Sequence, residues 1–475
     1  MAKTQTPASP SRVVHLSAEE RVAKGKAVRA QMPLEAHGEW APASDRPDPL
    51  ALLEEQAQSR VGELVPIRHG RMAASPFAFF RGAAYVMAAD LGPTPRTHLN
   101  VQLCGDAHLS NFGGFATPER SLVFDVNDFD ETHPGPFEWD IKRLAASLEI
   151  AARPRQFDAR QRTALVTQAV RSYRETMRTF AGMKNLDVWY ARLDVEAIMR
   201  TWGQGAGPKV IKNFQSAVVK AEAKDRLKAA AKLTHVVDGE PRIISDPPLI
   251  VPVEELFSEN DAQAVEDLVT AAFHAYRRSL LGDRRHLLES YRLVHIARKV
   301  VGVGSVGTRA WVVLLLGRDD QDPLFLQVKE AQASVLEAFL TKSSFTSHAQ
   351  RVVEGQHLMQ ASSDIFLGWE HNISIEGQPI DYYLRQLWDW KFSADIETMT
   401  PQVMGIYAQM CGWTLARAHA RSGDRIAIAS YLGRSDRFDR AIASFARAYA
   451  EQNDLDHRGL VEAIDSGRMA AQSGI

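Results

Sequence analysis

Residues 298–331, RKVVGVGSVGTRAWVVLLLGRDDQDPLFLQVKEA, restrict the fold more than any other part of the chain. Three β-like runs alternate with turns that are rich in Gly and Asp. Runs of this length joined by such short turns pair with their sequence neighbours in antiparallel order. The segment therefore predicts an antiparallel meander, whereas long stretches on both sides of it have a helical pattern. Together they indicate an α+β chain.

The first turn of this meander carries Gly302, Gly304 and Gly307 in a G-x-G-x-x-G spacing, with Ser305 between them. A dinucleotide-binding fold needs a helix directly after such glycines, but the sequence continues as a strand, TRAWVVLLLG. That fold is therefore excluded. A glycine-rich hairpin between strands has another use, because a backbone without side chains can approach nucleotide phosphates closely. We interpret this turn, with all four residues, as a phosphate-binding loop.

Lys329, near the end of the third β-like run, is the cation that such a loop would require. A buried ammonium group needs a counter-charge. Phosphate oxygens and a glutamate of the following helical sequence would both serve, and the candidates are Glu337 and Glu354. The sequence does not choose between them. The alternative is an ordinary surface lysine at the end of a strand.

Two acidic loops lie about two hundred residues earlier, each after an apolar, strand-like run: CGDAHLSNFGG (104–114) and LVFDVNDFDET (122–132). Phosphoryl transfer needs a carboxylate near the attacking hydroxyl and oxygen ligands for Mg²⁺. Kinases place a carboxylate and an asparagine five residues apart in one loop, as Asp106 and Asn111 are here. A turn rich in Asp and Asn for backbone reasons alone is the alternative, above all for Asp125.

The first loop resembles the G-D-x-H-x-x-N catalytic loop of aminoglycoside and homoserine-type phosphotransferases, which have a protein-kinase-like fold. NDFDETHPGPFEWDIKRLA resembles the segment that follows in those enzymes. The resemblance makes Asp106 the catalytic base, and Asn111, Asp128 and, more weakly, Asp130 the ligands of magnesium. It also implies that Asp140 braces the loop. Cys104 stands where these enzymes have a histidine.

From about residue 65 onward the chain also resembles the bacterial domain-of-unknown-function 2252 family. The motifs are GRMAASPFAFFRG, CGDAHLSNFG, NDFDET, VGVGSVGTR, QVKEAQ, SDIFLGW and LARAHARSGD. In ordinary kinases the glycine loop and lysine precede the catalytic loop, but here they follow it. We therefore expect a two-lobed kinase-like fold that is circularly permuted and contains a large helical insertion. Permutation is acceptable where the chain ends lie at the surface.

The 475 residues suffice for more than one core, and we expect five segments. These are an N-terminal tail with helices (1–60), the catalytic-loop part of one lobe (61–145), a helical region (146–290), an antiparallel sheet with the Gly-rich loop (291–392) and C-terminal helices (393–475). A helix is expected over 75–91 with Ser75 as its N-cap, and a proline-broken loop over 241–256.

Composition limits the partners. The net charge of −2 gives no bulk attraction to nucleic acid or to anionic membrane. Two cysteines provide no disulfide framework. The N-terminal sequence has no apolar core of a signal peptide, and no apolar run approaches the roughly 20 residues that span a bilayer. We expect a cytoplasmic protein without nucleic-acid or membrane partners, and the oligomeric state is not predicted.

We predict a phosphotransferase that uses ATP and Mg²⁺ on a small-molecule or protein hydroxyl, with nucleotidyl transfer as a variant. Arg71 and Arg81 are candidates for binding a substrate phosphate or carboxylate, and ion pairs with neighbouring acids are the alternative for both. A second reading is a metal-dependent phosphohydrolase with a cluster of Asp106, His108, Asp125, Asp128 and His133. A third is a nucleotide-binding sensor without catalysis.

Overall fold

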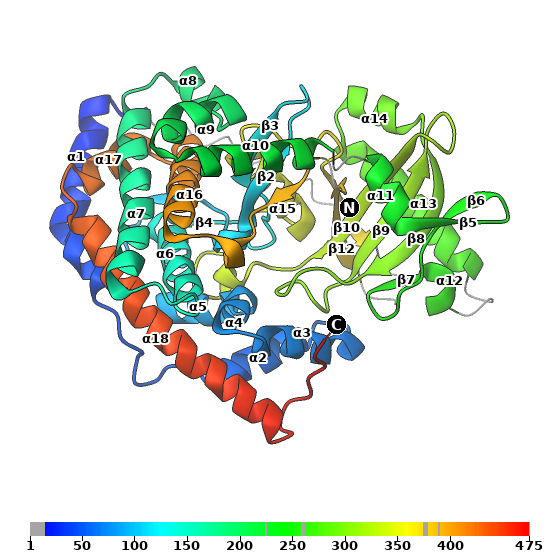
Figure 1. Cartoon of the computed structure of the whole chain (residues 1–475), viewed down its shortest axis with the longest axis horizontal. Coiled ribbons are helices and arrows are strands. Elements are labelled where there is room, and N and C mark those ends of the chain that lie inside the picture. The colour runs from blue at the N-terminus through cyan, green and yellow to red at the C-terminus, as the bar shows by residue number, and fades with distance from the viewer. Residues whose placement is uncertain (1–14, 224–225, 258–261, 374–378, 388–389, 475) are drawn as a thin grey trace, which may run out of the picture.

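A six-stranded antiparallel sheet forms one end of the molecule, and a helical lobe forms the other (Figure 1). The computed structural model describes residues 15–223, 226–257, 262–373, 379–387 and 390–474. The strand order of the sheet is β11-β12-β10-β9-β8-β7. Its strands are β7 (Ile250–Pro252), β8 (Arg292–Lys299), β9 (Ala310–Leu316), β10 (Pro323–Ala331), β11 (Gly368–Ile373) and β12 (Ile380–Gln386). The predicted meander is present as β8, β9 and β10.

Helices pack on both faces of this sheet. Successive residues of a strand point to opposite faces, so neighbouring residues belong to different cores. Val312 and Leu314 of β9 pack in one core with Leu233, whereas Val313 and Leu315 pack in another with Tyr276. The helices that supply these residues are α11 (Arg226–Leu233) and α13 (Ala262–Ser279). The strands are consequently apolar on both faces.

The helical lobe is built around α6, all of whose residues are buried. Tyr173 of α7 bonds to His419 of α16 at 2.9 Å, and Gly412 of α16 lies against the backbone of Ala169, where a Cβ atom would clash. These helices are α6 (Glu138–Ala152), α7 (Ala159–Ala181), α16 (Pro401–Ser422), α17 (Arg425–Leu432) and α18 (Arg437–Asp465). The N-terminal helices are α1 (Ala18–Gln31), α2 (Pro49–Ala57), α3 (Val65–Ala73), α4 (Pro76–Gly82) and α5 (Ala84–Leu91).

Two small sheets lie between the lobes and hold the acidic loops. In the first, β1 (Asn100–Leu103) pairs with β4 (His133–Pro136). In the second, β2 (Phe112–Ala116) pairs with β3 (Leu122–Val126) and with β13 (Phe392–Ser393). The β1–β2 loop and the β3–β4 loop are thereby fixed at both ends.

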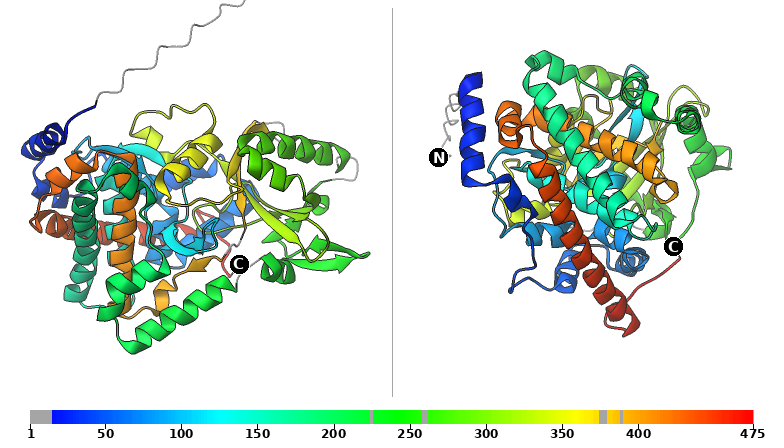
Figure 2. Two further views of the ribbon diagram at one scale, coloured as in Figure 1. Left: turned by 90° about the horizontal axis from the view of Figure 1, so that it is seen from above. Right: turned by 60° about the vertical axis from the view of Figure 1, so that its left-hand side comes forward.

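The middle of the chain links the two lobes. Helix α10 contacts β2 and β13 of the second small sheet, and α11 contacts β10 of the large sheet (Figure 2). The remaining helices are α8 (Asn185–Tyr190), α9 (Val195–Trp202), α10 (Pro208–Glu222), α12 (Val253–Leu256), α14 (Gly282–Leu288) and α15 (His348–Met359), and a hairpin is formed by β5 (Thr234–Val237) and β6 (Glu240–Ile243). No helix among the described residues combines the length and the apolar character that crossing a membrane requires.

Three local predictions need correction. The helix over 75–91 is interrupted at Ala83, which has ψ 37°, although Ser75 does cap its start by accepting from the Ala78 amide. The segment 241–256, predicted as a loop, contributes β6, β7 and α12. The stretch 146–290 is therefore not helical throughout. Prolines made the second segment look irregular, but β7 lies at the edge of its sheet, where proline is tolerated.

Candidate functional site

A cavity of about 680 Å³ lies where the acidic loops, the glycine-rich turn and the N-terminal helices meet. Asp106 and Asn111 reach it from the β1–β2 loop, and Asp128 and Asp130 from the β3–β4 loop. Gly302, Gly304 and Ser305 line it from the β8–β9 turn. Segments about two hundred residues apart thus share one cavity.

The β1–β2 loop is held from below by Asp140 of α6. Its carboxylate accepts hydrogen bonds from the backbone amides of Cys104 at 2.8 Å and Gly105 at 3.0 Å. Gly105 has φ +82°, and a Cβ atom there would lie 2.1 Å from the carbonyl oxygen of Glu131. Only glycine fits this bend, where the two acidic loops touch. The bracing role that the resemblance implied for Asp140 agrees with these contacts.

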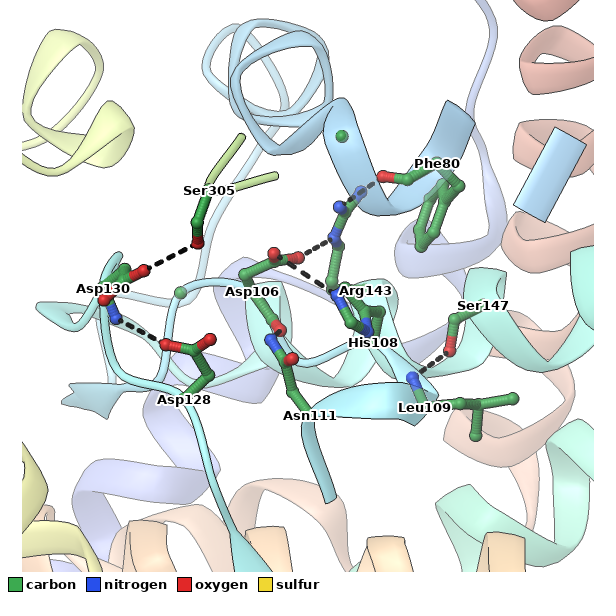
Figure 3. Close-up of polar contacts among 12 residues, drawn as sticks. Phe80, Asp106, His108, Leu109, Asn111, Asp128, Asp130, Arg143, Ser147 and Ser305 are labelled. Carbon is green, nitrogen blue, oxygen red and sulfur yellow. Dashed lines mark hydrogen bonds and ion pairs between the residues drawn. The ribbon is translucent and has the colours of Figure 1, made fainter. Parts of the chain in front are cut away.

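Asp106 contacts both Arg143 and His108, which lie on the same side of its carboxylate (Figure 3). Arg143 Nε donates to Asp106 Oδ1 at 2.8 Å, and its Nη2 donates to the Phe80 carbonyl at 2.6 Å. His108 Nε2 is 3.6 Å from Asp106 Oδ2. Burial lowers the pKa of His108 to about 4, which keeps the imidazole neutral at neutral pH. Asp106 is therefore oriented by one charged and one neutral partner.

Asn111 connects the two acidic loops. Its Nδ2 donates to the Asp106 carbonyl at 2.7 Å, and its own carbonyl accepts from the Asn127 amide at 2.8 Å. The amide nitrogen of the side chain is thereby engaged, which leaves the amide oxygen as an acceptor at the cavity.

Lys329 of β10 binds both carboxylates of the β3–β4 loop. Its Nζ is 2.5 Å from Asp130 Oδ2 and 3.4 Å from Asp128 Oδ1. Asp130 also accepts from the Tyr383 hydroxyl at 2.5 Å and from the Ser305 hydroxyl at 3.2 Å. The lysine is almost fully buried, but the Asp128 and Asp130 side chains are 30% and 29% exposed. Their oxygens can therefore be reached from the cavity.

The charges of this group stabilise one another. Burial alone would raise the pKa of Asp128, but the positive charges of Lys329, Arg385 and Lys391 hold it well below its usual range. Burial alone would lower the pKa of Lys329, but Asp128 and Asp130 raise it well above its usual range. Asp128 and Lys329 are therefore both ionised at neutral pH.

Glu131 behaves differently, because burial outweighs its hydrogen bond from the Val335 amide and raises its pKa to about 7.

The glycine-rich turn is anchored to the N-terminal helices. Arg71 donates to the Gly302 carbonyl at 2.6 Å, and the Val61 amide donates to the Gly307 carbonyl at 2.8 Å. Val303 and Val306 are buried against the N-terminal segment. Gly307, with φ +90°, packs on the Arg60 side chain and does not line the cavity, unlike the first two glycines.

The predicted partner of Lys329 is wrong. Neither Glu337 nor Glu354 bonds to it, since its contacts are with Asp128 and Asp130. Glu354 is exposed on α15, and Glu337 lines the cavity while accepting from the Ser343 amide. Helix α15 contacts the β3–β4 loop through an arginine and not through a glutamate. Arg351 donates to the backbone carbonyls of Asp130 and Thr132.

Two residues that hold the site were not predicted. Arg143 follows Asp140 by three positions on α6, so both lie on one helix face, and this spacing could have indicated it. Tyr383 pairs in register with Lys329 across β12 and β10. That pairing depends on contacts between distant segments, and no local pattern reveals it.

The five residues of the phosphohydrolase reading do not converge. Asp125 is buried and ion-paired with Arg417, and His133 Nε2 bonds to the Thr341 carbonyl at 2.6 Å. Neither lines the cavity. Within the described residues, no group of three or more His, Cys, Asp and Glu side chains is arranged to hold a metal ion.

A family model described as "Uncharacterized protein conserved in bacteria (DUF2252)" matches residues 60–463. The search of curated proteins and the search of solved structures found no match.

Proposed function

The chain belongs to the bacterial family DUF2252, and we propose that it is an ATP- and Mg²⁺-dependent phosphotransferase that acts on a hydroxyl group. The contact between Lys329 and the Asp128–Asp130 pair carries this proposal. Lysine after a glycine-rich turn and aspartates after a strand are the two halves of a kinase phosphate site. They come from opposite parts of the sequence and meet at the wall of one cavity, which Asp128 and Asp130 line.

The fold supports the same assignment. We propose that it is kinase-like and circularly permuted. The glycine-rich turn joins the first two strands of the meander β8–β9–β10, and the lysine lies on the third, as it does in protein kinases. A helix, α15, follows, and then two further strands, β11 and β12. The departure is the missing lysine–glutamate pair between the third strand and this helix.

The residues fit a magnesium ion. Asp128 and Asp130 present partly exposed carboxylates to the cavity, and Asn111 presents its amide oxygen. These are the hard oxygen donors that Mg²⁺ prefers. When bound, the ion would neutralise charge on the phosphate groups.

Asp106, Arg143 and Lys329 each have a separate role in the proposed transfer of the phosphoryl group. The acceptor oxygen forms a bond to the γ-phosphorus of ATP while the bond between that phosphorus and the ADP oxygen breaks. The proton of the acceptor hydroxyl passes to the Asp106 carboxylate, which Arg143 holds at Oδ1. Lys329 and the backbone of Gly302–Ser305 bind phosphate oxygens.

Thermal unfolding of the full chain with ATP, with and without Mg²⁺, tests the nucleotide site. A ligand that binds only the folded state raises Tm. We expect Mg·ATP to raise the Tm of the wild type above its values with ATP alone and with Mg²⁺ alone, and we expect Lys329→Ala and Asp128→Ala each to weaken the rise over Mg²⁺ alone. Lys342→Ala is the matched control, since this lysine lines the same cavity but is exposed. A wild type that shows no magnesium-dependent rise contradicts the proposal.

Product analysis then defines the reaction. Release of ADP indicates phosphoryl transfer, and release of pyrophosphate indicates nucleotidyl transfer by the same residues. Binding of Mg·ATP without release of either product would indicate a nucleotide-binding sensor without catalytic activity.

A further inference from the structure

Arg81 points to a second ligand in the cavity. Its guanidinium lines the cavity, and among the described residues it forms neither a hydrogen bond nor an ion pair. Its Nε is inaccessible to solvent and has no partner. Arg60, which also lines the cavity, donates to the Val306 carbonyl, and Arg143, which does not line it, binds Asp106.

The backbone around Arg81 places it between the catalytic carboxylate and the glycine-rich turn. Arg81 is in the last turn of α4, next to Phe80, whose carbonyl accepts from the arginine that holds Asp106. A Cβ atom on Gly304 would lie 3.2 Å from the Arg81 carbonyl oxygen. Arg81 is therefore fixed on a helix that touches both parts of the site.

The acids nearby are already bound to other cations. Asp106 is paired with Arg143, and Asp128 and Asp130 with Lys329. The pKa of Arg81 is lowered because burial outweighs the attraction of Asp106 and Asp128, but an arginine stays protonated in proteins. Its planar fork of N–H donors matches a carboxylate or a phosphate.

We propose that Arg81 binds an anionic group, a phosphate or a carboxylate, on the acceptor whose hydroxyl reaches Asp106. This inference rests on the proposed function. The nucleotide has its own partners in Lys329, the turn backbone and the metal ligands, whereas Arg81 is connected through Phe80 and Arg143 to the base.

The test measures anion binding by the full chain in the presence of Mg²⁺ and a non-hydrolysable ATP analogue. Inorganic phosphate is the probe for a phosphorylated acceptor, and glycolate is the probe for a hydroxy acid. We expect the wild type to bind one of these two anions. We expect Arg81→Gln to bind the same anion at least about tenfold more weakly, because a charge-assisted hydrogen bond is lost. Lys342→Gln removes one exposed charge from the same cavity and should change the affinity by less than about twofold.

The two arms identify the acceptor class, and the analogue separates this inference from the proposed function. If Arg81→Gln binds the analogue normally and loses only the anion, the inference is supported. The inference is overturned if wild type and variant bind the anion equally well, or if the wild type binds neither probe. In both cases, binding of the ATP analogue would still support the nucleotide site. Loss of analogue binding in Arg81→Gln overturns it in favour of a contact with the nucleotide.

Discussion

Lys329 Nζ lies 2.5 Å from Asp130 Oδ2 and 3.4 Å from Asp128 Oδ1, although 199 and 201 positions separate the lysine from these aspartates. The ammonium group binds the oxygens that a divalent cation would also use. If Mg²⁺ binds here as proposed, lysine and metal ion compete for the same carboxylates, and each would compensate for the charge that burial makes unfavourable.

Replacement of this lysine should expose the competition. Lys329→Met leaves two neighbouring carboxylates without their cation, and we expect a loss of about 3 kcal/mol in the free energy of unfolding when Mg²⁺ is chelated. Added Mg²⁺ should restore much of this loss and should stabilise the variant more than the wild type. Urea unfolding with EDTA and with Mg²⁺ measures both effects. Lys342→Met serves as the control, and an equal response of Lys329→Met and wild type to Mg²⁺ would refute the competition.

Glu131 predicts a pH-dependent stability. Its pKa is raised from 4.5 to about 7 by burial. Between these values the unfolded chain ionises first, so the folded state binds the extra proton and loses stability as the pH rises through this window. Glu131→Gln keeps an acceptor for the Val335 amide and removes the titration. Relative to the wild type, we expect the free energy of unfolding of the variant to rise by about 3 kcal/mol as the pH increases from below 4.5 to above 7.

Urea unfolding of both proteins across this pH range gives the difference directly. Glu354→Gln is the control, because this glutamate is exposed on α15. If the difference between Glu131→Gln and wild type stays constant with pH, Glu131 does not titrate in this window.

Asp125 separates the phosphotransferase from the phosphohydrolase reading. It is paired with Arg417, and both side chains are almost inaccessible to solvent. Asp125→Asn leaves the arginine charge buried without its counter-charge, so we expect a loss of about 3 kcal/mol in stability. The folded variant should still respond to Mg·ATP as the wild type does. Thermal unfolding with and without Mg·ATP measures both effects. Asp128→Asn should behave in the opposite way, losing the response to Mg·ATP with a smaller loss of stability, because Lys329 keeps Asp130.

Local patterns were sufficient for some parts of this molecule. The turns rich in Gly and Asp predicted β8, β9 and β10, and the two acidic loops do line one cavity. In each case the signal lies within a few neighbouring residues, which fix a turn or a strand by themselves.

Other parts depend on contacts between distant segments. His133–Pro136 forms a strand despite two prolines, because β1 is its only partner in the part of the chain that the structure describes. The sequence predicts the partner of Lys329 on the following helix. Instead, the β3–β4 loop supplies Asp130, and the sheet register places Tyr383, which donates to Asp130, opposite Lys329. Charge alone makes Glu337 and Glu354 reasonable candidates, but Glu337 accepts from the Ser343 amide before α15 begins, and Glu354 is exposed on α15.

Asp106 provides the decisive test of catalysis. Asp106→Asn keeps the shape of the side chain and removes the group that accepts the proton. We expect the variant to retain the rise in Tm with Mg·ATP, while ADP release falls by about 100-fold or more. Asp424→Asn, which alters the cap of α17 outside the cavity, should leave both quantities unchanged. If ADP release is the same in Asp106→Asn and wild type, another group accepts the proton. Glu131 is the next candidate, since it lines the same cavity and its pKa lies near neutral pH.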